Sequence, residues 1–423
     1  MRMNKKKEIV PKLRFPEFSK SYWGITRLNA LADKITERNK DDDISRVFTN
    51  SATEGVVDQE EYFDRDIANK NNLTNYFVVE KGDYVYNPRI STTAPVGPIS
   101  KNKLGIGVMS PLYTVFRFRN KENDFYEHFF LTNLWHAYIK NFSNTGARHD
   151  RITISVDNFM KMPLPYASPE EQQKIADCLS SIDELIDAES KKLKALEKYK
   201  KGLMQKLFPA EGKTLPELRF SEFQGCGEWK SAKLEELALY RRGSFPQPYG
   251  LPEWYDEKNG MPFIQVFDVG DNIKLKQNTK NKISKLAAQQ SVFIPKGTLI
   301  ITIQGSIGRV AITQYDAYID RTLLLFEKFY REIDKTFFAY NLQLLFEIEK
   351  QKAPGGIIKT ITKQALSEFV TSIPQFGEQQ KIARFLADID TVITEQSNKI
   401  EQLKAHKKGL MQGLFPSLQE VDV

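Results

Sequence analysis

The sequence predicts an α+β chain in which two mixed α/β domains are separated by two long helices that form an antiparallel coiled coil, arranged as a pseudo-twofold internal repeat. Three observations predict this organisation. A long helical segment at 171–209 returns at 378–416, with roughly 22 identities in about 39 positions and a constant offset of about 207 residues. Similar short motifs precede both domains. Each domain is a segment of about 150 residues rich in Phe, Tyr, Val and Ile.

The two long segments carry the heptad spacing of a coiled coil. In the first copy the apolar residues step by four and three: Ile175, Leu179, Ile182, Ile186, Leu193, Leu196, Leu203 and Leu207. About 38 helical residues at roughly 1.5 Å each give a rod on the order of 55 Å. This length favours a coiled coil over the alternative, in which both segments are ordinary amphipathic helices packed on their own domains.

Polar residues interrupt the two seams at corresponding places and predict how the helices pair. These residues are Glu189, Lys200, Gln396 and Lys407. A parallel pair in register would place Lys200 against Lys407, which is costly in an apolar seam. An antiparallel pair with Glu189 opposite Lys407, Lys200 opposite Gln396 and Ile186 opposite Leu410 matches every layer. The sequence therefore predicts this antiparallel register.

The repeat extends to the start of each domain. PKLRFPEF at 11–18 is echoed by PELRFSEF at 216–223, and a Trp follows each motif. The second motif comes directly after the Leu-Phe-Pro that ends the first helix, whereas the matching Leu-Phe-Pro and the first motif stand near opposite ends of the sequence. An antiparallel rod would bring those ends together, so we expect a unit that is circular in organisation.

Within the two domains, short β-rich runs and aromatic helices recur in the same order. Predicted strands flank a Lys-Gly turn in each domain, at 76–79 and 84–86, and at 291–294 and 299–303. Further strands are expected at 112–118 and 323–326. Aromatic helices are expected to start near Asp124 and Asp334 and to pack their rings into the core. The predicted boundaries are 1–168 for the first domain, 169–210 for the first helix, 211–375 for the second domain, and 376–423 for the second helix and tail.

Composition indicates a globular chain whose basic charge permits a polyanionic partner. The formal net charge is +7 and the pI is about 9.0, a bias shared by many proteins that bind no nucleic acid. No segment has the pattern of a secretory signal or a bilayer span, so we expect a cytoplasmic protein with no membrane association. Two scattered cysteines and four histidines without ligand spacing predict neither disulfides nor a metal site.

No catalytic motif is recognisable. The sequence lacks the Gly-x-x-x-x-Gly-Lys phosphate loop, the Gly-x-Gly-x-x-Gly fingerprint and the Gly-x-Ser-x-Gly elbow. Turns that combine glycine with basic, amide and hydroxyl groups can approach phosphates and base edges closely, and the alternative is that they are ordinary surface turns. By chemistry and position, the candidate DNA-binding residues are Arg89, Asn144, Arg148 and Arg151 in the first domain, and Gln247, Tyr249, Gln304, Arg309 and Lys359 in the second.

These candidate turns differ between the two domains, although the helices are alike. Residues 87–92 have no counterpart in the second domain, and residues 245–249 have none in the first. One scaffold therefore carries two divergent surfaces. This arrangement suits the recognition of an asymmetric ligand with two half-sites.

Over nearly its whole length the sequence resembles the DNA specificity subunits of type I restriction-modification systems. The resemblance is carried by the two Pro-x-Leu-Arg-Phe-x-Glu-Phe starts, the Glu-Gln-Gln-Lys-Ile-Ala openings at 171 and 378, and the two Lys-Lys-Gly-Leu-Met-Gln-x-Leu-Phe-Pro ends. It implies two target recognition domains, each reading one half of a bipartite sequence in double-stranded DNA. It identifies no individual base-reading residues.

The resemblance also implies a non-catalytic chain that works with enzymatic partners. Two methyltransferase subunits are expected to dock on it, and restriction subunits complete the nuclease. Adenine methylation with S-adenosylmethionine and ATP- and Mg-dependent cleavage would belong to those partners, so no cofactor is expected in this chain. Two alternatives remain from the sequence, a stand-alone DNA-binding regulator with two domains and a coiled-coil adaptor that binds only protein.

Overall fold

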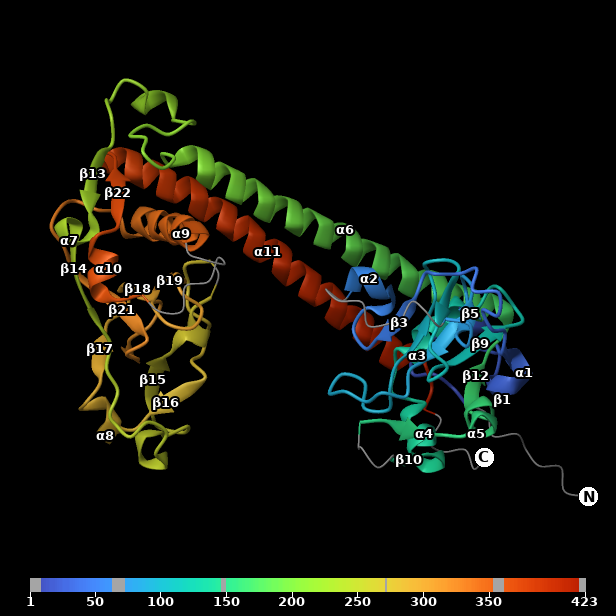
Figure 1. Cartoon of the computed structure of the whole chain (residues 1–423). Coiled ribbons are helices and arrows are strands. Elements are labelled where there is room, and N and C mark those ends of the chain that lie inside the picture. The colour runs from blue at the N-terminus through green and yellow to red at the C-terminus, as the bar shows by residue number, and fades with distance from the viewer. Residues whose placement is uncertain (1–8, 63–72, 146–149, 271, 353–360, 418–423) are drawn as a thin grey trace, which may run out of the picture. The chain divides into compact units, whose positions relative to one another are not determined.

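The computed structural model describes residues 9–62, 73–145, 150–270, 272–352 and 361–417. The chain divides into two compact units: unit 1 contains Met1–Ala188 and Ile400–Val423, and unit 2 contains Glu189–Lys399. The two long helices are α6 (Pro169–Leu207) and α11 (Phe376–Leu414), each of 39 residues (Figure 1). Part of each helix belongs to each unit.

Unit 1 is a mixed α/β unit. Besides its parts of α6 and α11, its helices are η1 (Pro16–Phe18), α1 (Leu28–Leu31), α2 (Gln59–Tyr62), α3 (Asp124–Phe130), α4 (His136–Phe142) and α5 (Val156–Met160). Its strands are β1 (Gly24–Arg27), β2 (Ala32–Lys34), β3 (Phe48–Ser51), β4 (Gly55–Asp58), β5 (Phe77–Val79), β6 (Tyr84–Tyr86), β7 (Ile99–Lys101), β8 (Gly107–Met109), β9 (Thr114–Phe118), β10 (Asn144–Thr145), β11 (Ile152–Thr153) and β12 (Pro163–Tyr166).

Unit 2 has a similar set of elements. Its helices are η2 (Ser221–Phe223), α7 (Leu234–Leu237), η3 (Pro252–Trp254), η4 (Val266–Asp268), α8 (Lys285–Ala288), α9 (Lys335–Lys352) and α10 (Lys363–Ser367). Its strands are β13 (Lys230–Lys233), β14 (Ala238–Arg242), β15 (Met261–Ile264), β16 (Asn281–Ile283), β17 (Val292–Ile294), β18 (Leu299–Thr302), β19 (Val310–Ile312), β20 (Ala317–Ile319), β21 (Leu323–Phe329) and β22 (Val370–Ile373).

The sheets of the two units show the duplication directly. A four-stranded antiparallel sheet has the order β2-β9-β6-β7 in unit 1 and β14-β21-β18-β19 in unit 2. A two-stranded antiparallel ladder, β1 with β12 or β13 with β22, leads into α6 or α11. The remaining strands diverge. Unit 1 has the separate ladders β3-β4 and β5-β8, whereas unit 2 has one sheet of order β16-β15-β20-β17.

The strand predictions around the Lys-Gly turns are confirmed. β5 and β6 flank Gly82, and β17 and β18 flank Gly297, with φ of 98° and 82° at the two glycines. A positive φ disfavours residues with a Cβ, which explains why both turns contain glycine. The two strands around each turn join different sheets, so neither turn closes a hairpin.

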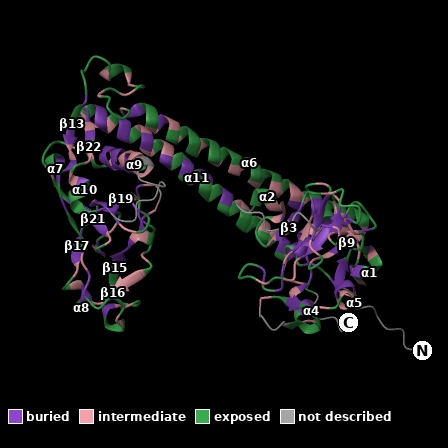
Figure 2. Ribbon diagram, viewed as in Figure 1, coloured by how far each residue is buried: buried purple, intermediate pink, exposed green. Residues whose placement is uncertain are grey.

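The aromatic helices form the core as expected, but the first is broken in two. Phe129 and Phe130 are buried in unit 1, and Phe337 and Phe338 are buried in unit 2. Figure 2 shows that α9, the second of these helices, contains many buried residues. In unit 2 the helix is continuous over Lys335–Lys352. In unit 1 it stops after Phe130, because the Thr132 hydroxyl donates to the Phe129 carbonyl at 2.7 Å and the indole of Trp135 donates to the Phe130 carbonyl at 3.1 Å. These local bonds replace those of a continuing helix.

The start of α6 follows from its sequence. Ser168 caps the helix, because its Oγ accepts from the Glu171 backbone N–H at 3.3 Å, and Pro169 occupies the first helical position. Glu170 and Glu171 place negative charge at the positive end of the helix dipole. Both long helices end shortly before a proline, Pro209 or Pro416, which cannot continue a helix.

The antiparallel pairing of α6 and α11 is confirmed within each unit. In unit 1, Ile175 and Leu179 of α6 share a core with Leu414 near the end of α11. In unit 2, Leu207 near the end of α6 shares a core with Ile382 near the start of α11. The first turns of one helix thus pack beside the last turns of the other.

The register expected from the seam residues is wrong. Lys407 Nζ binds both carboxylate oxygens of Asp183 at 2.6 Å, and Lys200 Nζ binds Asp390 Oδ1 at 2.6 Å. Glu189 accepts hydrogen bonds from Lys399 Nζ at 2.5 Å and from Gln396 Nε2 at 2.6 Å, and these two bonds lower the pKa of Glu189. Lys407 therefore does not pair with Glu189, nor Lys200 with Gln396.

The physical reason is that the expected register paired only residues inside the seam. Asp183 and Asp390 follow the seam residues Ile182 and Ile389, so they flank the seam instead of filling it. A lysine can keep its alkyl stem among apolar neighbours while its ammonium group reaches such a flanking carboxylate. The helices are consequently shifted by about one heptad from the expected alignment. Since the two aspartates occupy equivalent places in the repeat, one ion pair is present twice.

Candidate nucleic-acid interface

The described candidates of unit 1 lie in one cluster of loops. Arg89 and Arg151 face each other across an antiparallel bridge, in which the Ile152 backbone N–H donates to the Pro88 carbonyl at 2.9 Å. Asn144 pairs with Thr153 in the short β10-β11 ladder, two residues beyond Arg151. The side chains of Arg89, Asn144 and Arg151 are exposed. The fold therefore brings three of the four predicted residues together, and Arg148 lies outside the described residues.

The first candidates of unit 2 lie on the loop that follows β14. Gln247 and Tyr249 are both exposed. The loop is anchored by the Trp254 indole, which donates to the Pro248 carbonyl at 3.1 Å, and by the Phe245 ring, whose centroid is 4.9 Å from that of Tyr249. An anchored loop presents its exposed polar side chains in a defined geometry.

The other candidates of unit 2 are divided between two places. Gln304 is half-buried in a turn. The next residue, Gly305, lies close to Val266, since a Cβ added at Gly305 would stand 3.6 Å from Val266 Cγ1. Arg309 donates from Nη1 to the Val269 carbonyl at 3.3 Å and lines a pocket with Lys200 of α6. Arg309 is thus placed on the side of unit 2 that contacts α6. Lys359 lies outside the described residues, and whether these side chains touch DNA stays a prediction.

Sequence reasoning missed a basic segment and three polar residues beside Tyr249. Gln265 donates from Nε2 to the Tyr249 hydroxyl, Asn281 donates from Nδ2 to Gln265 Oε1 at 2.6 Å, and the guanidinium of Arg321 lies 5.8 Å from the centre of the Tyr249 ring. Asn281 belongs to a lysine-rich segment, which contains Lys274, Lys276, Lys280, Lys282 and Lys285. The density of lysines is a signal available in the sequence. The contacts of Gln265 and Arg321, in contrast, depend on chain segments that only the fold brings together.

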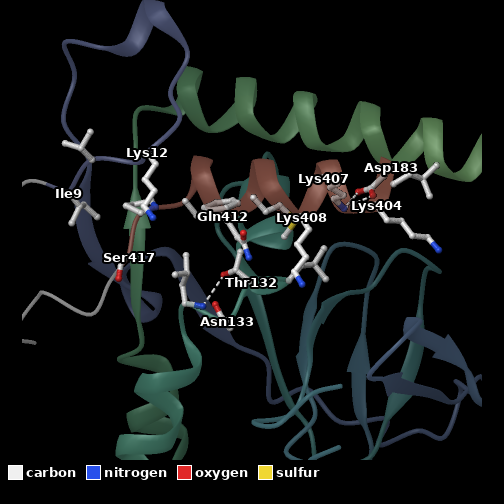
Figure 3. Close-up of a pocket in the computed structure, with 17 residues that line it drawn as sticks. Ile9, Lys12, Thr132, Asn133, Asp183, Lys404, Lys407, Lys408, Gln412 and Ser417 are labelled. Carbon is white, nitrogen blue, oxygen red and sulfur yellow. Dashed lines mark hydrogen bonds and ion pairs between the residues drawn. The ribbon is translucent and has the colours of Figure 1, made fainter. Parts of the chain in front are cut away.

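A pocket of about 1030 Å³ lies in unit 1, among parts of the chain that carry the repeat (Figure 3). Lys404, Lys407 and Lys408 of α11 line it together with Lys12, and the Lys407–Asp183 ion pair forms part of its wall. Apolar side chains, among them Ile9, Leu131, Met411 and Phe415, complete the lining. None of the described DNA-binding candidates lines this pocket, so it is distinct from the loop cluster around Arg89.

The repeated start motifs have a structural role in both units. Arg14 donates from Nε and Nη2 to the two carboxylate oxygens of Glu171, each at 2.7 Å. Arg219 makes the same two-pronged bond to Glu378, at 2.8 and 2.7 Å. Both glutamates are buried, and the bond raises the pKa of each arginine. The Leu-Arg-Phe motif and the Glu-Gln-Gln opening of the helix are therefore two halves of one contact.

Comparison with known families gives this duplicated scaffold its identity. The profile of the type I restriction modification DNA specificity domain matches residues 33–198 and 227–405, one match for each copy of the repeat and together well over half of the chain. The chain belongs to the type I restriction-modification DNA specificity family. The family resemblance expected from the sequence motifs is confirmed.

Curated relatives of this family come from Methanocaldococcus jannaschii. The putative type I restriction enzyme MjaX specificity subunit is 27% identical over 272 residues, which cover 60% of this chain and 57% of that protein. The type I restriction enzyme MjaVIII specificity subunit is 26% identical over 323 residues, covering 72% of each chain. The match to the first relative thus spans little more than half of its length.

Two solved structures share the fold. A chain from a study of complex assembly and conformational transition of the type I R-M system has a TM-score of 0.58 and 18% identity, with 93% of this chain and 96% of that chain covered. The type I restriction-modification system S subunit from M. genitalium has a TM-score of 0.57 and 14% identity, with 97% and 100% covered. At these identities the likeness establishes the fold of this family member.

The described ranges contain neither a membrane-spanning helix nor a metal-binding cluster. Among the helices of these ranges, none combines the length and hydrophobicity needed to cross a membrane. Within the same ranges, no group of three or more His, Cys, Asp and Glu side chains is placed to hold a metal ion.

Proposed function

We propose that the chain recognises a bipartite sequence in double-stranded DNA, with unit 1 reading one half-site and unit 2 the other. The observation that supports this is a repeated scaffold with divergent loops. The Arg–Glu contact at the helix start and the Lys–Asp contact between the helices occur once in each unit. In contrast, the loops around Arg89 and Tyr249 and the sheets next to them differ. Two units with the same internal contacts but different loops suit a DNA target whose two halves differ in sequence.

The same repetition supports a second part of the proposal, that two copies of a methyltransferase subunit bind this chain. Because each unit carries the same contacts between start motif and long helix, each offers a partner the same scaffold. Restriction subunits then complete a nuclease. In this proposal S-adenosylmethionine, ATP and Mg are bound by the partners, and the complex acts on DNA in the cytoplasm. The chain itself selects the DNA sequence and binds the other subunits, and it catalyses no reaction.

Genome-wide mapping of N6-methyladenine tests the proposal. We expect a host that carries this chain and its methyltransferase partner to show methylation at one bipartite motif, and the same host without the chain to lose it. Replacing the loops and sheets of unit 2 by those of a relative, with α6 and α11 kept, should change one half of the motif and preserve the other. An uninterrupted motif, or methylation that persists without the chain, would contradict the proposal.

A further inference from the structure

The surface around Tyr249 combines an exposed aromatic hydroxyl with an exposed cation. The Tyr249 side chain is 40% exposed and sits on the loop after β14. Arg321, which follows β20, is also exposed and places its guanidinium 5.8 Å from the centre of the Tyr249 ring. A guanidinium at this distance from an aromatic ring is attracted by its π-electrons, which favours holding the two side chains together.

A chain of two amides determines what the Tyr249 hydroxyl can do. Asn281 Nδ2 donates to Gln265 Oε1 at 2.6 Å, so the oxygen of the Gln265 amide is used and its NH₂ group faces Tyr249. Gln265 is only 9% exposed, and its backbone N–H is also bound, to Asp268 Oδ2 at 2.9 Å. Because Tyr249 accepts a hydrogen bond from Gln265, its own O–H is left to donate. Within the described part of the chain, that O–H has no acceptor.

The hydroxyl stays protonated over the range in which proteins function. Burial raises the pKa of Tyr249, and the nearby carboxylate of Asp320 raises it further. Tyr249 and Arg321 are therefore neighbouring donors, since a guanidinium has donors and no acceptor. A ligand that satisfies both must present acceptor atoms.

The surroundings favour an anionic ligand. Asn281 lies within the lysine-rich segment defined above, four of whose five lysines are exposed. Lys280 is held there, because its backbone N–H donates to Asp268 Oδ1 at 2.9 Å and its ammonium group lies 5.0 Å from the centre of the Phe267 ring. Clustered lysines create the positive potential that attracts a polyanion such as DNA.

We propose that Tyr249 and Arg321 together donate hydrogen bonds to acceptor atoms of the DNA half-site read by unit 2, and that Gln265 and Asn281 are positioning residues that orient the Tyr249 hydroxyl. This inference rests on the function proposed above. The acceptors are either phosphate oxygens or the O6 and N7 atoms of a guanine edge, which share the same chemistry.

The test measures binding of the target duplex by the chain assembled with its methyltransferase partners. Tyr249→Phe removes the donor and should weaken binding roughly tenfold. Gln265→Glu should weaken binding equally, because the new carboxylate accepts hydrogen bonds from both Asn281 and the Tyr249 O–H, which then no longer donates to DNA. The variant that combines Tyr249→Phe with Gln265→Glu should bind DNA no more weakly than either single variant, since both changes remove the same hydrogen-bond donor. Tyr330→Phe, at another exposed tyrosine of unit 2, is the matched control and should bind as the unchanged complex does.

A second variant, Asn281→Asp, tests the same positioning role in case Gln265→Glu does not fold. In Asn281→Asp the new carboxylate attracts the Gln265 NH₂ group, so the Gln265 oxygen turns to Tyr249 and accepts a hydrogen bond from its O–H. Binding should again fall roughly tenfold, with an unchanged thermal unfolding midpoint. If Tyr249→Phe binds as the unchanged complex does, the proposed contact is wrong. If it weakens binding but Gln265→Glu and Asn281→Asp do not, the positioning role is wrong.

Two further measurements separate the two kinds of acceptor. For a guanine edge, the Tyr249→Phe complex should methylate genomic sites that differ at one position of a single half-site. For a phosphate, the preferred motif should stay the same, and Arg321→Ala should reduce the slope of log K against log salt by about one. If the unchanged complex binds no bipartite site at all, the function proposed above fails as well. If it binds such a site and every variant binds it equally, only this inference fails.

Discussion

The buried Arg–Glu pair at the start of each long helix explains why the start motifs recur. In unit 1 the side chain of Glu171 is 1% exposed and that of Arg14 is 10% exposed. A carboxylate with so little access to water depends on its partner for stabilisation. The neighbouring pair of Lys174 and Glu17 is different, because the two side chains are 52% and 49% exposed and the charged atoms are 3.4 Å apart.

Arg14→Met should therefore destabilise unit 1 much more than Lys174→Met. We expect Arg14→Met to lower the free energy of unfolding by about 3–5 kcal/mol, because it leaves the buried Glu171 carboxylate without its partner. Lys174→Met breaks an exposed pair and should cost about 0–1 kcal/mol. Urea unfolding followed by tryptophan fluorescence measures both. Adding Glu171→Gln to Arg14→Met should recover part of the loss, and equal losses in the two single variants would contradict the argument.

His128 makes unit 1 sensitive to acid. Its ring is buried and its Nε2 lies 3.1 Å from Ser180 Oγ. Burial and the nearby Lys407 ammonium lower the pKa of His128 to about 4, from an ordinary value of 6.5. Between these two values the unfolded chain binds a proton that the folded chain does not. The contribution of His128 to stability is thus complete above pH 6.5 and is lost as the pH falls towards 4.

His128→Gln isolates this contribution, because the glutamine amide reaches the same position and does not titrate. Thermal unfolding at several pH values should show the unchanged protein losing stability faster than the variant between pH 6.5 and about 4, by on the order of 2–3 kcal/mol over that range. Other acidic groups contribute equally to both proteins and cancel in the difference. Parallel curves would show that His128 is protonated as easily in the folded chain as in the unfolded one.

At the scale of elements, the contacts between α6 and α11 specify a register that disulfide formation can report. With Cys178 and Cys226 replaced by serine, cysteines at Glu189 and Gln396 should form a disulfide, because these side chains now share a hydrogen bond. Cysteines at Ile186 and Leu410 should not, since a shift of about one heptad separates them by roughly 10 Å along the helices. Gel mobility under oxidising conditions distinguishes the two outcomes. If only the cysteines at Ile186 and Leu410 cross-linked, the register expected from the seam residues would be correct instead.

The sequence predicted elements better than the pairing between them. Heptad spacing and the flanking prolines located α6 and α11, because these signals act along one chain segment. The register depended on Asp183 and Asp390, which look like ordinary exposed helix residues until the partner helix is present. The same limit applies to the candidate interface. Tyr249 could be selected by its chemistry, whereas Gln265, which orients it, lies 16 positions further along the chain and no local pattern marks that contact.

At the scale of the whole molecule, duplication separates what must stay constant from what is free to change. The backbone N–H of Leu13 donates to the Gly413 carbonyl at 2.8 Å, and that of Leu218 donates to the Lys206 carbonyl at the same distance. The segment that joins α6 to the second start motif thus has its counterpart in unit 1, where the early and late parts of the sequence meet. This confirms the circular organisation expected from the motifs. The strands that diverge, in the ladders β3-β4 and β5-β8 of unit 1 and the sheet β16-β15-β20-β17 of unit 2, lie outside these repeated contacts.

A final prediction concerns the length of the long helices, which we propose sets the number of unread base pairs between the two half-sites. One heptad inserted into α6 between Asp183 and Lys200, and one into α11 between Asp390 and Lys407, keeps both Lys–Asp pairs and lengthens the coiled coil by roughly 10.5 Å. At about 3.4 Å per base pair this corresponds to about three base pairs. Methylation mapping should then show a spacer longer by about three base pairs, with both half-sites unchanged.

The control for this prediction is a heptad inserted into α6 alone. That variant cannot keep both Lys–Asp pairs, because only one helix is lengthened between them, so it should be less stable and should methylate its target poorly. A deletion of one heptad from both helices should shorten the spacer by a similar amount. If the doubly lengthened chain is folded and active but methylates the original motif, the helices do not measure the spacing, although their antiparallel pairing would stand. A longer spacer with unchanged half-sites would show that the repeat separates two independent readers, because the distance between them would then change without affecting what each one reads.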